Sequence, residues 1–178
     1  MNRRDWFALL REGHYKVATA NSDSHEGRQL VAYPRNYLAL AADSPGEVDA
    51  LSLATAVRSG HLYGTTGPLL WVDLDGVPPG GVFKGQGATL RVRVAHAPWV
   101  PVDEVRVWRD GELWQTAAIP PNGMLTFDVQ AQADGYLFVE VSGQAGGLYA
   151  IVAPGLQPFA FANPVFIDRA GDGWRFGE

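Results

Sequence analysis

The sequence predicts an α+β protein in which a short segment of alternating helices and strands (residues 1–66) is followed by an antiparallel β-sandwich (residues 67–178). Two observations lead to this prediction. The 21 glycines and 12 prolines among 178 residues favour many short strands and turns over long helices. After residue 66, the alternation of helix and strand patterns gives way to runs in which apolar and polar residues alternate, as in half-buried strands.

The first 66 residues alternate between helix and strand signals. The expected elements are a helix from Asp5 to Gly13, a strand at 16–20, a strand at 37–41 and a helix from Ser44 to Gly60. Asp5 and Ser44 belong to the residue types that cap helix starts, and glycine is a common residue at helix ends. Short joins between such elements are typical of a parallel sheet or a β/α barrel.

The remaining residues contain seven expected strands, at 69–74, 88–95, 104–109, 125–129, 136–141, 148–152 and 159–168. Asp–Gly and Asn–Gly pairs, which favour tight turns, lie between several of them. In the second strand, Leu90, Val92 and Val94 alternate with Arg91 and Arg93, so one face is apolar and the other is charged. Seven short strands without an intervening helix predict a β-sandwich.

Charge and cysteine content exclude several classes of protein. The net charge of −5 argues against a nucleic-acid partner or an anionic membrane surface, because both favour a basic face. The absence of cysteine excludes a disulfide framework, a thiolate zinc site and a cysteine nucleophile. Residues 141–167 carry no charge, but three prolines interrupt them, so buried strands and turns are expected there rather than a membrane span. The compartment is not indicated.

A polar cluster, Asn-Ser-Asp-Ser-His at residues 21–25, follows the strand expected at 16–20. At strand spacing, Asp23 and His25 point to the same side of the chain. A carboxylate with an imidazole suits zinc, manganese or iron. From the spacing alone, the pair is either part of a metal site or the polar end of a loop.

Several segments together carry a family resemblance, namely residues 5–13, 20–25, 33–37, 64–68 and 162–168. They resemble the closing part of a PHP (polymerase and histidinol phosphatase) domain, in particular its carbaryl-hydrolase-like (CehA/McbA-like) branch, which appends a β-domain to the barrel. The resemblance implies that residues 1–66 are the C-terminal remnant of a PHP-type β/α barrel and that the rest is the appended β-domain.

The same resemblance implies a function and a set of site residues. In the family, the Ser-Asp-Ser-His segment brings ligands to a multinuclear metal site, which implies that Asp23 and His25 bind metal. The implied reaction is hydrolysis of a phosphoester, a carbamate or a carboxyl ester by metal-activated water, with zinc, manganese or iron as cofactor. Arg35 and Asn36, in the matching Tyr-Pro-Arg-Asn-Tyr segment, are candidates for holding an anionic group of the substrate.

The sequence also departs from the family pattern. The early His-x-His pair and the intervening His and Glu ligands of the family do not occur in it. A catalytic zinc takes about three protein ligands, so we expect this chain alone to bind metal weakly or not at all and to be inactive. It therefore resembles the C-terminal region of a hydrolase from which the N-terminal PHP segment is missing. We expect the uncovered remnant to dock on the β-domain and to form a homodimer.

An alternative interpretation belongs to a different functional class. The β-sandwich could be a binding module for a saccharide or a protein, with the barrel segment as a vestigial scaffold. The candidate stacking residues for such a module are the tryptophans Trp71, Trp99, Trp108 and Trp114, although aromatic residues of a sandwich are more often core residues.

Overall fold

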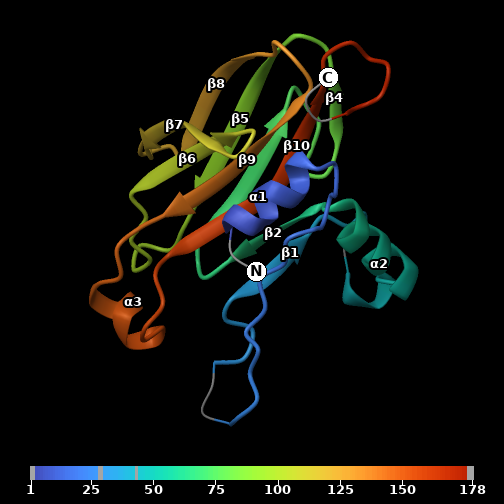
Figure 1. Cartoon of the computed structure of the whole chain (residues 1–178). Coiled ribbons are helices and arrows are strands. Elements are labelled where there is room, and N and C mark those ends of the chain that lie inside the picture. The colour runs from blue at the N-terminus through green and yellow to red at the C-terminus, as the bar shows by residue number, and fades with distance from the viewer. Residues whose placement is uncertain (1–2, 28–29, 43, 176–178) are drawn as a thin grey trace.

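Two β-sheets packed face to face form the body of the protein in the computed structural model, which describes residues 3–27, 30–42 and 44–175 (Figure 1). The large sheet has the strand order β1-β2-β10-β9-β6-β7, and β4 pairs with β10. Its strands are β1 (Arg35–Leu38), β2 (Leu62–Thr65), β4 (Val82–Lys84), β6 (Glu104–Arg109), β7 (Glu112–Ala118), β9 (Gly135–Ser142) and β10 (Phe159–Asp168). The small sheet has the order β3-β5-β8, with β3 (Leu69–Leu74), β5 (Gly87–Ala95) and β8 (Met124–Gln130).

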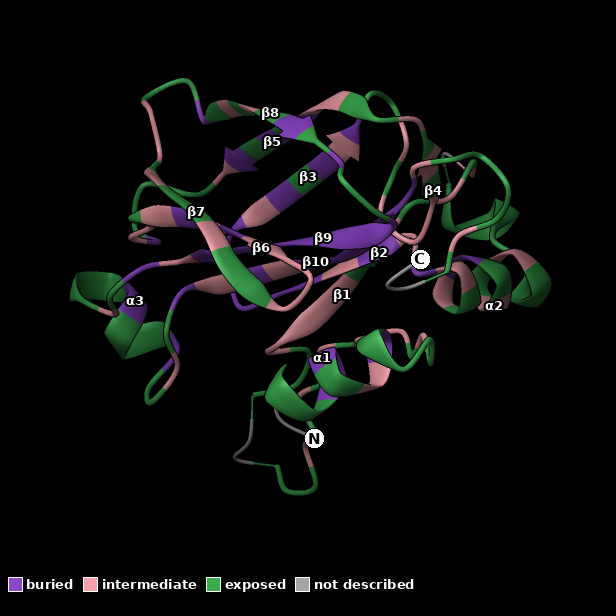
Figure 2. Ribbon diagram, turned by 45° about the horizontal axis from the view of Figure 1, so that its top comes forward, coloured by how far each residue is buried: buried purple, intermediate pink, exposed green. Residues whose placement is uncertain are grey.

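The hydrophobic core lies between the two sheets (Figure 2). Because side chains alternate along a strand, the central strands contribute every second residue to it. Leu70, Val72 and Leu74 of β3 face the interior, and Val105 and Val107 of β6 meet them from the large sheet. The pairings within both sheets are antiparallel except for β4 with β10. The prediction of a largely antiparallel, sheet-rich α+β fold is thus confirmed.

Helix α1 (Arg3–Arg11) packs on the outer face of the large sheet (Figure 1). It presents Trp6, Phe7 and Leu10 to an aromatic surface of that sheet, and all three are buried. The rings of Phe7 and Phe138 meet edge to face with their centroids 5.6 Å apart. The helix ends close to Gly13, as expected, where the backbone takes a φ of 77°. The apolar side of this first helix is therefore covered within the same chain.

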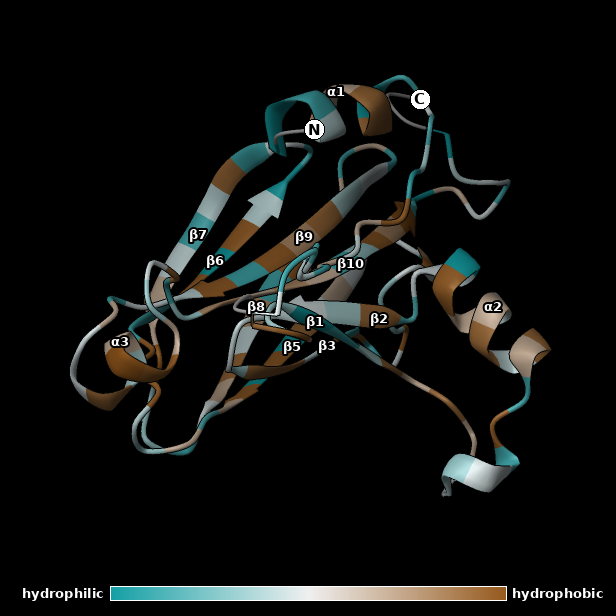
Figure 3. Ribbon diagram, turned by 90° about the horizontal axis from the view of Figure 1, so that it is seen from below, coloured by the Kyte–Doolittle hydropathy of each residue, from teal (hydrophilic) through white to brown (hydrophobic). Residues whose placement is uncertain are grey.

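The prediction of a parallel strand pair within residues 1–66 is wrong for the described residues. β1 pairs antiparallel with β2, and β2 pairs antiparallel with β10. A parallel pair requires a crossover that packs on the face of the sheet. The connection from β1 to β2 does not supply one, because α2 (Ala50–Ser59) stands to one side of the sheets (Figure 3). No evidence of a β/α-barrel arrangement is found in the described part of this segment.

Other local predictions also need correction. The first helix begins at Arg3, so Asp5 lies in its first turn and does not precede it as a cap. Residues 16–20 form no strand, and residues 148–152 lie in a short helix, α3 (Gly147–Val152), rather than in a strand. The second helix is capped by Asp49, whose side chain accepts the backbone N–H groups of Leu51 and Ser52. Ser44 instead precedes a single 3-10 turn, η1 (Pro45–Glu47), and makes no side-chain cap bond there. Gly60 ends α2 as expected, at a φ of 75°.

The chain passes from the large sheet to the small one at the boundary expected near residue 66. β2 ends at Thr65, whose hydroxyl donates to the Pro68 carbonyl at 2.6 Å and accepts the Gly67 N–H at 2.8 Å. β3 begins at Leu69. Residues on both sides of this boundary therefore contribute strands to one sheet, and the division into two domains stays a prediction. None of the helices within the described residues is long and apolar enough to cross a membrane.

Candidate functional site

A loop carrying Asp23 and His25 extends from one end of the molecule, between α1 and β1 (Figure 1). Two asparagine side chains fix the chain at its base. Asn163 accepts the Ala18 N–H at 2.8 Å and donates to the Ala18 carbonyl at 3.1 Å. Asn36 does the same for Ala20, with distances of 2.8 and 2.7 Å. These amides replace the strand pairing expected for residues 16–20, because they satisfy the backbone without a neighbouring strand.

The structure brings the two expected metal ligands together. Nε2 of His25 lies 2.9 Å from Oδ1 of Asp23, and the two side chains are 77% and 87% exposed, respectively. The reason differs from the one expected, because Asp23 has a φ of 49° and the residues therefore do not lie on a strand. The Ser24 hydroxyl donates to the Leu30 carbonyl at 3.0 Å and ties the two arms of the loop. A turn, rather than strand alternation, makes the pair converge.

The donor chemistry of this pair fits zinc, manganese or iron, since it combines a carboxylate oxygen with an imidazole nitrogen. The described residues contain no group of three or more His, Asp or Glu side chains arranged to hold a metal ion. Two exposed ligands are fewer than a catalytic metal normally takes from its protein. The expectation of weak metal binding by this chain alone stays a prediction.

The two predicted substrate-binding residues lie on opposite faces of β1. Asn36 faces the outer side, where its amide binds the backbone of Ala20. Arg35 faces the space between the sheets and lines a pocket of about 320 Å³ together with Trp99 and His96. Its Nε donates to the Tyr37 hydroxyl at 3.2 Å. Adjacent strand residues point to opposite faces, so these two side chains do not meet at one ligand.

A second, apolar pocket of about 380 Å³ adjoins the same strand. The rings of Tyr37 and Tyr63 stack along one wall, 5.2 Å apart and 10° from parallel. Burial raises the pKa of Tyr63 to about 12, so this hydroxyl stays protonated at neutral pH. No pattern within one segment of the sequence predicts this pocket, because its walls come from strands of both sheets.

A buried carboxylate that the sequence analysis missed lies under α1. Glu140 is 1% exposed, and both of its oxygens lie 2.7 Å from Nη1 of Arg3. Arg106 Nη1 is 3.6 Å from the same carboxylate. The available signal was a single glutamate within the apolar strand β9. With two arginines as its neighbours, this group holds α1 to the sheet, which is a structural role.

Two further buried aspartates hold the C-terminal loop. Asp168 accepts the backbone N–H groups of Gly171 and Gly173, at 2.7 and 3.0 Å. Asp134 accepts those of Arg169 and Arg175, at 2.7 and 2.9 Å. All four carboxylate oxygens thus accept a backbone hydrogen bond, and these groups shape the turn after β10.

No family model, curated protein or solved structure matches this chain.

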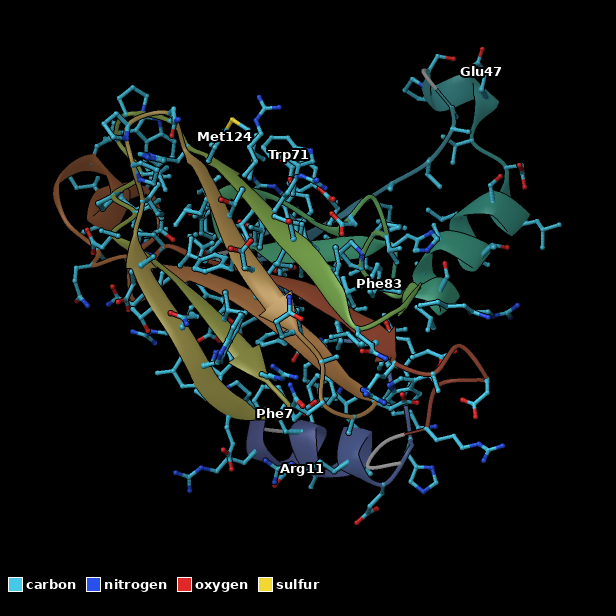
Figure 4. All side chains as sticks on the ribbon, turned by 90° about the horizontal axis from the view of Figure 1, so that it is seen from above. Phe7, Arg11, Glu47, Trp71, Phe83 and Met124 are labelled. Atoms are coloured by element: carbon cyan, nitrogen blue, oxygen red, sulfur yellow. The ribbon has the colours of Figure 1, made fainter. Side chains whose placement is uncertain are left out.

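The four tryptophans proposed as a stacking surface lie in different places. Trp71 is on the outer face of the small sheet, near Met124 (Figure 4). Trp108 lies under α1, where the guanidinium of Arg3 is 4.0 Å from its ring centroid. Trp114 packs against the core between the sheets, and Trp99 lines the pocket of Arg35. They do not form one continuous surface.

Proposed function

We propose that this chain is the C-terminal region of a PHP-type, metal-dependent hydrolase and that Asp23 and His25 supply two of its metal ligands. The observation that supports this most strongly is the convergence of the two side chains at 2.9 Å on an extended loop where both are exposed. Exposure leaves the pair accessible to further ligands from another protein segment. The sequence resemblance adds the reaction class and the barrel origin of residues 1–66, which the antiparallel pairing of β1 does not itself support.

In this proposal each residue has a definite task. Asp23 offers a carboxylate oxygen, and His25 offers a ring nitrogen that must be free of its proton. Bound zinc, manganese or iron would supply an acidified water as nucleophile for a phosphoester, a carbamate or a carboxyl ester. Arg35 holds an anionic group of the substrate, whereas Asn36 fixes the base of the metal loop through Ala20. We propose no activity for this chain alone, because two ligands leave the metal site incomplete.

The test begins with the DNA directly upstream of the codon for Met1. The proposal expects an open reading frame that encodes a His-x-His pair and further His and Glu ligands. The protein expressed with that segment should hydrolyse p-nitrophenyl phosphate or p-nitrophenyl acetate when supplied with manganese or zinc. Asp23→Ala should lower this activity by more than about 100-fold, beyond the effect typical of residues that only support a ligand. Activity in Asp23→Ala or His25→Ala equal to that of the wild-type protein would refute the proposal.

A saccharide- or protein-binding module remains the alternative, and one observation favours it. Trp71 is 44% exposed on a sheet face, and the guanidinium of Arg93 lies 4.8 Å from its ring centroid. Exposed aromatic rings on a sheet can stack on a sugar ring. In that case a glycan array should give a hit that Trp71→Ala abolishes and Asp23→Ala leaves unchanged.

A further inference from the structure

The two pockets beside β1 meet at one residue. Leu69, the first residue of β3, lines both the apolar pocket and the pocket of Arg35. Arg35 and Tyr37, one in each pocket, are two residues apart on the same face of β1 and are joined by a hydrogen bond of 3.2 Å. We name the two pockets together, from Arg35 past Leu69 to Tyr63, the β1 trough.

One end of the β1 trough is suited to an anion. Among the described residues that line it, Arg35 is the one lysine or arginine, and none is an aspartate or a glutamate. The chain as a whole carries a net charge of −5, so this positive end is a local feature. A guanidinium has five N–H donors in a planar fork that matches a carboxylate, and the Tyr37 hydroxyl takes one of them.

The other end is suited to a hydrocarbon chain. Its walls are the stacked rings of Tyr37 and Tyr63 on the large sheet and the residues Leu70, Pro78 and Pro79 on the opposite side. The pocket holds about 380 Å³, which is within the range of small-molecule sites. An alkyl chain placed there would leave water and contact mostly carbon atoms.

We propose that the β1 trough binds a medium-chain carboxylate, with its head group on Arg35 and its alkyl chain across Leu69 between Tyr63 and Pro79. Charge complementarity at one end and an apolar wall at the other specify an anionic amphiphile rather than a purely polar or purely apolar ligand. This inference shares with the proposed function, on which it rests, only the assignment of an anionic ligand to Arg35. It requires no metal.

Isothermal titration calorimetry of the purified full chain with hexanoate, octanoate and decanoate, in buffer containing a chelator, tests the proposal. The ligands are kept below their aggregation limits. Affinity should rise by up to about fourfold for each added CH₂ group, as expected when each group leaves water. Failure of decanoate to bind, or an affinity independent of chain length, would overturn the proposal without any variant.

The head-group assignment is tested with Arg35→Gln, whose fold is checked by its thermal melt. It should lose at least tenfold in decanoate affinity and should bind decanol, which has no charge, as the wild type does. Arg93→Gln is the matched control, because Arg93 also lies over an aromatic ring but lines neither pocket. Equal decanoate affinity in Arg35→Gln and the wild type would contradict the assignment.

Asp23→Ala separates this inference from the proposed function. It should bind decanoate as the wild type does, because Asp23 does not line the trough. If decanoate fails to bind while metal binding at Asp23 and His25 is found, the trough is wrong and the hydrolase proposal stands. If decanoate binds and metal does not, the trough proposal stands and the hydrolase proposal is wrong.

Discussion

Both carboxylate oxygens of Glu140, in β9, lie 2.7 Å from Nη1 of Arg3, in the first turn of α1. This contact joins residues that are 137 positions apart in the chain. Together with the burial of Phe7, which points from α1 toward the sheet in Figure 4, it attaches the first helix to the outer face of the large sheet. The N-terminal segment is thus bound to the β-sandwich by charge as well as by apolar surface.

Removal of this contact should destabilise the protein. Arg3→Ala leaves Glu140 buried beside the more distant Arg106, and we expect a loss of about 1–3 kcal/mol in the free energy of unfolding. Urea denaturation at pH 7 measures the change. Arg4→Ala, at the next and exposed position of the same helix, should change it by less than about 0.5 kcal/mol. Equal effects of the two variants would show that the Arg3–Glu140 pair contributes nothing specific.

Gly60 should tolerate a side chain less well than Gly13 does. Both have positive φ after a helix, so alanine costs each about 1–2 kcal/mol. A Cβ at Gly60 would in addition overlap the Tyr15 hydroxyl. A Cβ at Gly13 would have no atom of another, non-adjacent residue within 4 Å. Gly60→Ala should therefore lower the melting temperature more than Gly13→Ala, and Tyr15→Phe should relieve part of the difference. A larger effect of Gly13→Ala in thermal melts would be evidence against this packing.

Asp110 should make stability depend on pH. Burial raises the pKa of this carboxyl, although the Tyr136 N–H that it accepts at 2.8 Å acts in the opposite direction. The folded state therefore holds the proton more tightly than the unfolded state does. It follows that the contribution of Asp110 to stability is complete below the unfolded pKa of about 3.9 and is lost as the pH rises through the folded pKa.

Asp110→Asn keeps an acceptor for the Tyr136 N–H and suits the φ of 54° at this position. The variant should therefore remove this decline and gain stability relative to the wild type between pH 4 and pH 7. Urea denaturation at a series of pH values measures the difference, with the exposed Asp128→Asn as control. A difference between wild type and Asp110→Asn that does not vary with pH would disprove the assignment.

The homodimer expected through residues 1–66 stays a prediction, and two exposed residues allow a matched test. Leu51 on α2 is 72% exposed, and Ile151 on α3 is 77% exposed. If residues 1–66 form the dimer interface, Leu51→Lys should raise the dimer dissociation constant and Ile151→Lys should not. Light scattering over a range of protein concentrations measures this. A monomer mass at all concentrations, or weakening only by Ile151→Lys, would exclude the expected interface.

The sequence predicted best those elements whose own residues carry the pattern. The alternation of Leu90, Val92 and Val94 with arginines correctly placed β5 with one buried face. β2 was missed because its four residues, which include Gly64 and Thr65, show no alternation of apolar and polar side chains. It is a strand only because β1 and β10 pair with it on either side. A pattern within one segment carries no information on such partners.

Conversely, a strand was predicted at residues 16–20 where none forms, because long-range contacts take the place of strand pairing there. Residues 16–20 have the composition of a strand, but the side chains of Asn36 and Asn163 take the place of a neighbouring strand. The association of Asp23 with His25 was expected from strand spacing, but the turn at Asp23 brings the two side chains together. The β1 trough was not expected, since Leu69 and Arg35 come together only when the sheets pack.

The most direct test of the proposed metal site is a titration of the isotope-labelled protein with Mn²⁺, followed by paramagnetic broadening of its NMR signals. We expect broadening that is strongest at residues 23–25, with an affinity weaker than micromolar, and that is lost in His25→Ala and Asp23→Ala. The ring signals of His61 and His96 should remain sharp. Broadening centred on any other part of the chain, or unchanged in His25→Ala, would contradict the assignment of Asp23 and His25 as metal ligands.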